Sequence, residues 1–162
     1  MNVFYLDHNT DDCAKYHNDK HCVKMILEYA QLLSTCHRVL DGDQCIDKVY
    51  KATHKNHPSA IWARSNSENY KWLYKLFCSL SKEYEYRYDR SHLSFVKLEN
   101  VLVNQPKNIV TGSFNQPTPA MPEYCKIPNN SLASYRKYYI NEKSHIAYWK
   151  KREIPSWYKE NK

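Results

Sequence analysis

Apolar residues recur at intervals of three and four positions between residues 19 and 40, which predicts a long amphipathic helix. The side chains that share its apolar side are Val23, Ile26, Leu27, Ala30 and Leu33. Asp41-Gly42 follows directly, and glycine suits the left-handed conformation in which many helices end. We therefore expect this helix to stop at residue 41 and to bury one side.

A second long helix is predicted from Ser65 to about Tyr88. Ser65 and Glu68 have the spacing of a capping box, in which two side chains at a helix start bond to each other's backbone N–H groups. The predicted apolar face consists of Trp72, Leu73, Leu76, Phe77 and Leu80.

Three shorter helices are predicted around these two. Asn9 or Thr10 can cap a short first helix, another helix covers residues 94–103, and a last one runs from about residue 130 to Lys151. The apolar stretch at residues 2–6 fits either an edge strand or a buried N-terminal arm.

Proline marks the one long irregular segment. Residues 104–130 hold five of the seven prolines, which predicts an ordered crossing without regular structure. With 162 residues, fifteen Tyr, four Trp and only two Gly, the chain fits one compact body. We expect a mostly α fold, a single helical domain over residues 1–162, with a short N-terminal strand possible.

Positive charge is concentrated at the C-terminus. The chain carries +7, and residues 136–162 hold eight Lys or Arg against three Glu, a net +5. The tail, about residues 148–162, interleaves rings with cations, a pattern typical of contacts with DNA bases and phosphates. Its candidate DNA-binding residues are Lys150, Lys151, Arg152, Trp157, Tyr158 and Lys159. The alternative is that the rings pack onto the body, with one Trp inside and the other in solvent.

Cysteine spacing and hydropathy bear on the compartment. None of the six Cys forms a C-x-x-C pair, which favours buried free thiols in a reducing compartment. No apolar run approaches membrane length, and nothing resembles a signal peptide. We expect a cytoplasmic protein without membrane partners, located in the host cell if a phage encodes it.

Polar side chains form a stripe on the far side of the first long helix. His17, His21, Lys24, Glu28 and Gln31 cluster there at helical spacing. Such a stripe is either the solvated face of an ordinary helix or the floor of a site. We expect it to line a cleft that the segment from His54 to Pro58 closes.

Metal binding is one alternative for the stripe. Histidines four apart, such as His17 and His21, can hold one metal ion. The zinc-peptidase signature requires Glu directly after the first His, but Asn18 stands there. A metal-dependent hydrolase that uses this pair is therefore a secondary hypothesis, and neither a metal nor another cofactor is expected.

The second segment with candidate chemistry precedes Pro58, where a helix can begin. His54, Lys55 and His57 lie beside that helix start, an arrangement that favours phosphate binding. The alternative is a surface loop with a capping histidine.

Three stretches together resemble the pyrimidine-dimer DNA glycosylase family, the endonuclease V type of phage and bacteria, and related phage proteins of uncharacterised function. They are the K-x-x-x-E-x-x-Q pattern of Lys24, Glu28 and Gln31, the HP-x-x-x-W pattern of His57, Pro58 and Trp62, and the closing Pro155-Ser156-Trp157-Tyr158-Lys159. The resemblance spans most of the chain.

The resemblance implies a compact helical enzyme that kinks DNA, flips a nucleotide and attacks the sugar with its N-terminal amine, assisted by a helix glutamate. This chain departs from the family at two positions. Asn2 is too bulky for routine removal of Met1, so the terminal amine belongs to Met1. The family's glutamate falls where His21 stands, and Glu28 lies two turns further along the same face.

We therefore expect a DNA-binding protein that acts as a glycosylase-like hydrolase or lyase on damaged or modified bases. Its catalytic candidates are Glu28, His21 and His57, and further DNA contacts are expected from Lys20, Lys24, His54 and Lys55. The alternative from another class is a non-catalytic phage protein that binds nucleic acid or counters a host defence.

Overall fold

The structure is a computed structural model that describes residues 1–162, and it contains helices and irregular segments but no β-strand. This confirms the predicted helical class. In chain order the α-helices are α1 Thr10–Tyr16, α2 Asp19–Asp41, α3 Pro58–Arg64, α4 Ser67–Tyr88, α5 Leu93–Leu102, α6 Ser131–Glu142 and α7 Ser156–Lys159. Three short 3₁₀ helices lie at Gly42–Gln44, Glu123–Cys125 and Ser144–Ile146.

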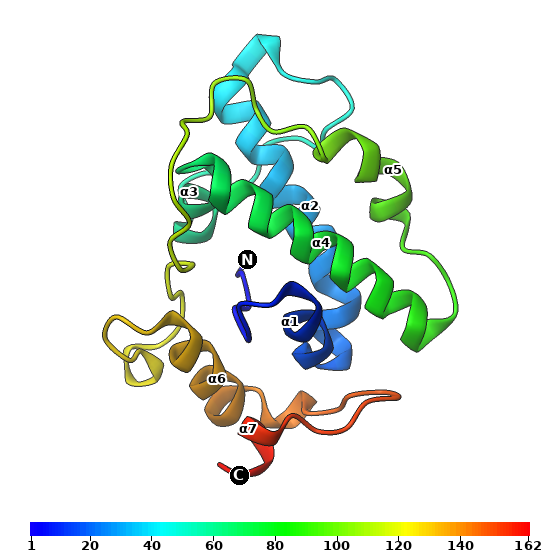
Figure 1. The fold of residues 1–162 in the computed structure, drawn as a ribbon, viewed down its shortest axis with the longest axis vertical. Helices are drawn as coiled ribbons and strands as arrows, with labels where there is room; N and C mark the ends of the chain where they lie inside the picture. Colours follow the sequence, from blue (N-terminus) through cyan, green and yellow to red (C-terminus); the bar gives the residue numbers. More distant parts are fainter.

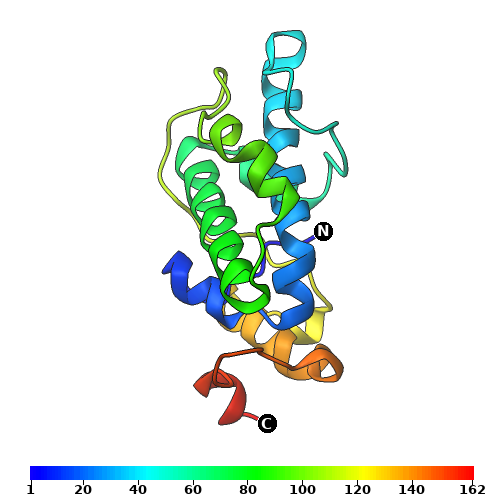
Figure 2. The same ribbon diagram turned by 90° about the vertical axis from the view of Figure 1, so that its right-hand side faces the viewer.

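The two longest helices, α2 and α4, cross at the centre of the molecule (Figure 1). Helix α5 packs against both of them, and α1 packs against α4 (Figure 2). The predicted apolar face of α4 is buried throughout, from Trp72 to Leu80. Burying these side chains away from water is the main force that holds α4 in place.

The buried side of α2 is rotated relative to the predicted one. Ile26, Ala30 and Leu33 are buried as expected, but Val23 and Leu27 are about 40% exposed. The core side is instead widened in the other direction by Met25 and Tyr29, among others. Val23 and Leu27 lie along one edge of the apolar stripe. Helical spacing alone does not show which of the two edges the neighbouring elements cover.

The N-terminal arm, residues 1–6, is a buried irregular segment rather than a strand. Val3 and Leu6 are completely buried. Partners far along the chain hold the arm, since Arg136 of α6 donates a hydrogen bond to the carbonyl of Leu6. Because these bonds come from side chains and not from a second strand, the arm has no sheet to join.

Two predicted helix ends differ in the structure. Asn66, not Ser65, caps α4 by accepting from the N–H of Asn69, while the Ser65 hydroxyl donates to the Ile61 carbonyl at the end of α3. Helix α6 ends at Glu142, nine residues before the predicted end at Lys151. There the chain turns so that Trp149 is buried against the body, and tertiary burial outweighs continuation of the helix.

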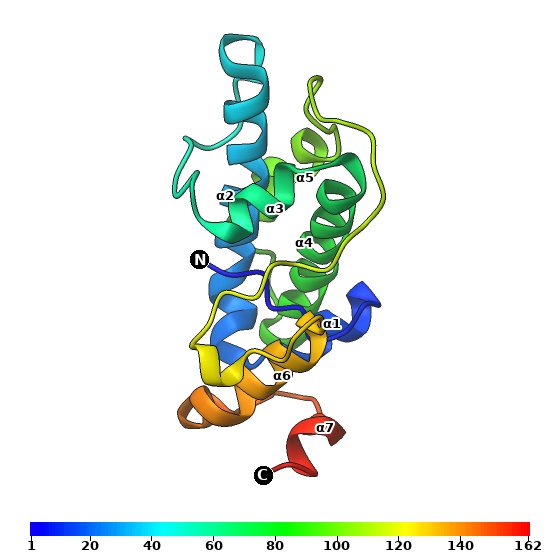
Figure 3. The same ribbon diagram turned by 90° about the vertical axis from the view of Figure 1, so that its left-hand side faces the viewer.

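The proline-rich segment of residues 104–130 crosses from α5 past the N-terminal arm to α6, as Figure 3 shows. Side chains from the helices order this segment by accepting hydrogen bonds from its backbone N–H groups. The carboxylate of Asp41 accepts from Lys107 and Asn108, and the amide oxygen of Asn69 accepts from Asn115. The predicted ordered crossing is confirmed.

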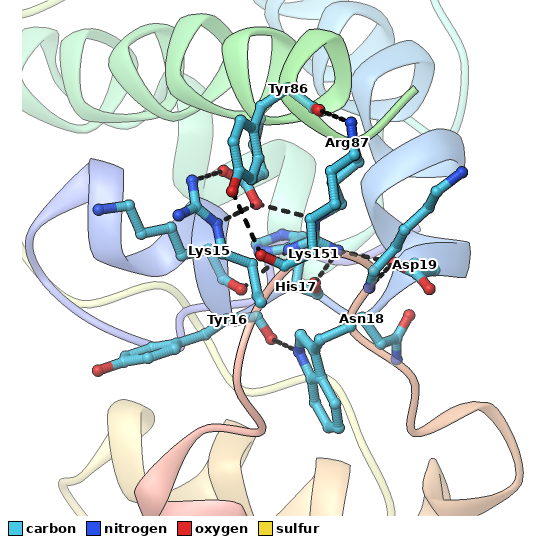
Figure 4. Close-up of polar contacts among 12 residues, drawn as sticks. Lys15, Tyr16, His17, Asn18, Asp19, Tyr86, Arg87 and Lys151 are labelled. Carbon is cyan, nitrogen blue, oxygen red and sulfur yellow. Dashed lines mark hydrogen bonds and ion pairs between the residues drawn. The ribbon is translucent and has the colours of Figure 1, made fainter. Parts of the chain in front are cut away.

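The C-terminal segment, residues 143–162, is fixed to the ends of α2 and α4 (Figure 4). Arg87 is fully buried and donates to the carboxylates of Glu83 and Asp19 and to the carbonyls of Lys15 and His17. Asp19 in turn accepts from the N–H of Lys150, so the segment and the two helices share one network of charges.

None of the helices combines the length and the apolar composition that crossing a membrane requires. The six cysteines are all free thiols; four are buried, and Cys45 and Cys78 are partly exposed.

Candidate functional site

The α-amine of Met1 lies 3.4 Å from Oε1 of Glu28, in the third turn of α2. The Glu28 side chain is only 13% exposed, and its other carboxylate oxygen is buried without a hydrogen bond, 3.8 Å from the ammonium of Lys24. Lys24 is largely exposed, so this second pairing is weak. The carboxylate is therefore directed at the amine and not into open solvent.

A pocket of about 170 Å³ surrounds this pair. It is lined by Met1, Asn2, Phe4, His21, Lys24, Met25, Glu28, Tyr138 and Lys143. Three residues of the predicted stripe, His21, Lys24 and Glu28, are thus brought together in a cleft, while His17 is not part of it. A larger pocket of about 480 Å³ next to α6 and α7 has no carboxylate or imidazole in its lining and offers no comparable proton acceptor.

The segment before α3 does not line this pocket, so it does not close the cleft as predicted, but the amine acts on it electrostatically. His57 caps α3, and its Nδ1 accepts from the N–H of Ser59, which leaves the ring proton on Nε2 when the imidazole is neutral. Burial, then the charge of the Met1 amine, then His54 lower the pKa of His57. Figure 3 shows the N-terminus beside α2 and α3. A neutral imidazole therefore lies within electrostatic reach of the amine.

His21 is a neutral wall of the pocket. Its ring stacks on Phe4 with centroids 4.1 Å apart, and its Nδ1 lies 2.6 Å from the hydroxyl of Tyr139. Burial, with smaller contributions from nearby positive groups, lowers the pKa of His21 to about 2. At neutral pH this ring carries no charge, so it is poorly suited to give up a proton.

His17 is completely buried and belongs to the core. Its Nδ1 lies 2.7 Å from the Cys13 carbonyl and its Nε2 lies 2.7 Å from the Tyr29 hydroxyl. Both ring nitrogens are engaged, so the His17–His21 pair does not form the metal site of the secondary hypothesis. Nowhere in the chain do three His, Cys, Asp or Glu side chains come together in an arrangement that could hold a metal ion.

The expected DNA-binding residues fall into two groups. Lys20, Lys24, His54 and Lys55 are exposed, and Lys24 lines the pocket itself. In the tail Lys150, Lys151 and Lys159 are also exposed, but they lie on the segment fixed to the end of α4. Lys151 pairs there with Asp89.

The tail aromatic residues do not match the expectation of base stacking. Trp149 and Trp157 are 7% and 8% exposed and Tyr158 is 4% exposed, so both tryptophans are inside. Arg152 is bound to the carboxylate of Glu83 by two hydrogen bonds. The rings are needed to fill the space next to α6 and α1, and this packing makes their faces unavailable to DNA.

Sequence reasoning missed five residues of the pocket, namely Asn2, Phe4, Met25, Tyr138 and Lys143. Lys143 and Tyr138 come from the end of α6 and carry no motif. Their ammonium and ring lie 4.9 Å apart. The apolar N-terminal stretch was recognised as a possible buried arm, but residues 3–6 are all buried, so no pattern along it singles out Phe4.

A comparison with protein-family models matches residues 1–95 to the family described as pyrimidine dimer DNA glycosylase. That range includes Met1, Glu28 and His57, and it covers more than half of the 162 residues. Comparisons with curated proteins and with solved structures gave no match. Because this match covers more than half of its residues, the chain belongs to the pyrimidine dimer DNA glycosylase family.

Proposed function

We propose that this protein is a DNA glycosylase in which the Met1 amine attacks C1′ of a damaged or modified nucleotide. The observation that supports this is the 3.4 Å pairing of that amine with Glu28 in a pocket next to exposed lysines. Family membership favours pyrimidine dimers as the lesion. A nucleotide must leave the base stack to bring C1′ to the amine.

The reaction requires the amine in its neutral form, and Glu28 is the nearest group that can accept its proton. The nitrogen lone pair forms a bond with C1′, while the bond from C1′ to the base breaks and its electron pair leaves with the base, which takes up a proton. Glu28 passes the proton that it took from the amine to the departing base. The new C1′–N bond makes the nitrogen positive, and the nitrogen then loses a proton to the Glu28 carboxylate, which is free again to accept it.

Glu28 can return that proton to O4′ as the sugar ring opens, which leaves a protonated imine between Met1 and C1′. Water then hydrolyses the imine and releases the amine. Alternatively, loss of a proton from C2′ eliminates the 3′ phosphate and breaks the strand, which is the lyase branch. His57, neutral and protonated on Nε2, is assigned to donate a hydrogen bond to substrate oxygen, and His21 is assigned to the pocket wall.

Phosphate binding is assigned first to Lys20 and Lys24 of α2 and to His54 and Lys55 before α3, because all four side chains are exposed and Lys24 lines the pocket. Lys143 adds a cation inside the pocket. The tail residues Lys150, Lys151 and Lys159 are assigned to phosphates further along the duplex, since they are exposed but do not line the pocket. None of these contacts depends on the base sequence.

The test uses duplexes that carry a pyrimidine dimer, a modified base or an abasic site, with sodium borohydride to reduce any imine to a stable amine. We expect a covalent protein–DNA adduct, located on Met1 by peptide mass spectrometry, together with an intact mass that includes Met1. Glu28→Gln should lower the rate at least about 100-fold while DNA affinity changes by no more than a few-fold. Glu68→Gln, on an exposed carboxylate of α4, is the matched control.

Tight binding of all three duplexes without any adduct or strand cleavage would favour the non-catalytic binding protein instead. Loss of activity with a chelator and its recovery with zinc would favour the metal-dependent hydrolase. An adduct on a lysine rather than on Met1 would reject the assignment of the nucleophile.

A further inference from the structure

The position of the Met1 amine depends on a chain of hydrogen bonds that starts at His17. The carbonyl of Cys13 only accepts, so Nδ1 of His17 carries the proton of the 2.7 Å bond between them. Nε2 is then the acceptor, and the Tyr29 hydroxyl donates a hydrogen bond of 2.7 Å to it. This leaves the Tyr29 oxygen free to accept from the N–H of Phe4 at 3.2 Å.

Every group in this chain is satisfied, and all of it is buried. His17 and Tyr29 are both completely inaccessible, and burial lowers the pKa of His17 to about 4, so its neutral form persists at neutral pH. A neutral ring with one defined tautomer directs the Tyr29 hydroxyl in one direction only. The backbone of the arm is therefore fixed at Phe4, three residues from the amine.

A second tyrosine fixes the arm at Asn2. The hydroxyl of Tyr135, on α6, lies 3.0 Å from Oδ1 of Asn2 and 3.1 Å from the carbonyl of Thr118, and it accepts from the N–H of Ala120. Its single proton is shared between two acceptors that the fold has placed together. Tyr135 is completely buried, so water does not compete for these bonds.

We propose that Tyr29 and Tyr135 are positioning residues that aim the Met1 amine at Glu28 by fixing the arm at Phe4 and Asn2. Neither hydroxyl touches the reacting atoms, since both act through the arm. The inference rests on the proposed function, because the amine matters only if it is the nucleophile. It adds to the site two side chains that carry no family motif, one of them outside the matched residues 1–95.

The experiment compares Tyr29→Phe and Tyr135→Phe with Tyr70→Phe. Tyr70, on α4, is a matched control. Like Tyr29, it pairs a buried hydroxyl with a histidine, since this hydroxyl lies 2.9 Å from Nε2 of His37 on α2, but it makes no hydrogen bond to the arm. On abasic duplex we expect kcat to fall about 10- to 100-fold in the two positioning variants with KM unchanged, since small displacements of reacting groups have effects of this size. Tyr70→Phe should keep the kcat of the unsubstituted protein.

A second readout does not require glycosylase activity. Reductive methylation with formaldehyde and cyanoborohydride reports how accessible the Met1 amine is, measured on the N-terminal peptide. We expect faster methylation in Tyr29→Phe and Tyr135→Phe than in Tyr70→Phe. If Tyr135→Phe fails to fold, Asn2→Leu replaces it, because leucine is similar in size, retains Met1 and accepts no hydrogen bond from Tyr135. If Tyr29→Phe fails to fold, the Tyr135 bond alone is tested.

Equal kcat and equal methylation in all three variants would overturn the positioning role, while a Met1 adduct in the unsubstituted protein would leave the proposed function intact. If the unsubstituted protein forms no adduct, the proposed function fails. Methylation then decides separately whether the two tyrosines hold the amine in place.

Discussion

The guanidinium of Arg152 lies against the carboxylate of Glu83 with two hydrogen bonds, of 3.0 Å from Nε and 2.8 Å from a terminal nitrogen. Arg87 binds the same carboxylate from the other side at 2.8 Å. Burial alone would raise the pKa of Glu83, but the hydrogen bonds from Arg152 and Arg87 outweigh it and hold the pKa below its usual value. One carboxylate thus joins the C-terminal segment to α4.

Glu83→Gln should lower the free energy of unfolding by about 3 kcal/mol, because it leaves the buried guanidinium of Arg87 without its nearest opposite charge. Urea denaturation at neutral pH measures this. Glu85→Gln is the control, since Glu85 is an exposed carboxylate of the same helix. A loss shared equally by both variants would mean that the network contributes no more than surface charge does.

Stability should fall as the pH is lowered from 7.5 to 5.5. Folding lowers the pKa of His17 to about 4 and that of His21 to about 2, while the unfolded chain takes up protons near the ordinary value of 6.5. The unfolded state therefore binds more protons below pH 6.5, and each histidine should cost about 1 kcal/mol by pH 5.5. Urea titrations at both pH values measure the slope.

His21→Phe isolates one share of that pH dependence, because phenylalanine can keep the stacking on Phe4 but does not titrate. The difference in unfolding free energy between pH 7.5 and 5.5 should become smaller by about 1 kcal/mol. An unchanged difference would show that other groups cause the acid sensitivity.

Trp157→Ala should destabilise the fold by about 3 to 5 kcal/mol, because it empties a buried volume beside Arg136, whose guanidinium lies 5.2 Å from the ring centre. Thermal unfolding measures this. Tyr148→Ala, at a ring that is 70% exposed, should change stability by less than about 0.5 kcal/mol. A Trp157 variant with full stability but weaker DNA binding would instead restore the view of the tail as a stacking surface.

DNA affinity should fall steeply with salt, and Lys20→Ala with Lys24→Ala should reduce the magnitude of the salt slope by about two. Both side chains are exposed on α2, and Lys24 lines the pocket. Fluorescence anisotropy between low and moderate salt measures the slope. We expect a smaller effect from Lys150→Ala with Lys151→Ala, since Lys151 already pairs with Asp89. Affinity that does not change with salt would remove the electrostatic argument.

The helices were predictable because their signals are local. The spacing of apolar residues located α2 and α4 nearly to their ends, and the proline content located the irregular crossing. Two predictions were wrong. Val23 and Leu27 were expected to be buried but lie on the exposed edge of the apolar stripe, and α6 ends earlier than expected because the chain turns to bury Trp149. Both depend on neighbours that are distant along the chain.

The candidate site was predictable only in part. Lys24 and Glu28 stand out because helical spacing and the family pattern coincide there, and His57 stands out as a possible cap. Lys143 and Tyr138 reach the pocket from α6, and no local pattern links them to residues more than a hundred positions earlier. His17 was wrongly predicted to belong to the site, because a histidine at a position of the polar stripe is a fully buried core residue in the structure.

The course of the N-terminal arm also affects how the molecule folds. The arm is synthesised first, yet its bonds from Tyr135 and Arg136 join residues 133 and 130 positions apart. Contacts between such distant residues form late and slow the folding of a chain. A nascent chain that ends before α6 can contain Met1, Glu28 and His57 and still leave the amine unfixed. The pocket is therefore completed only after α6 has been made.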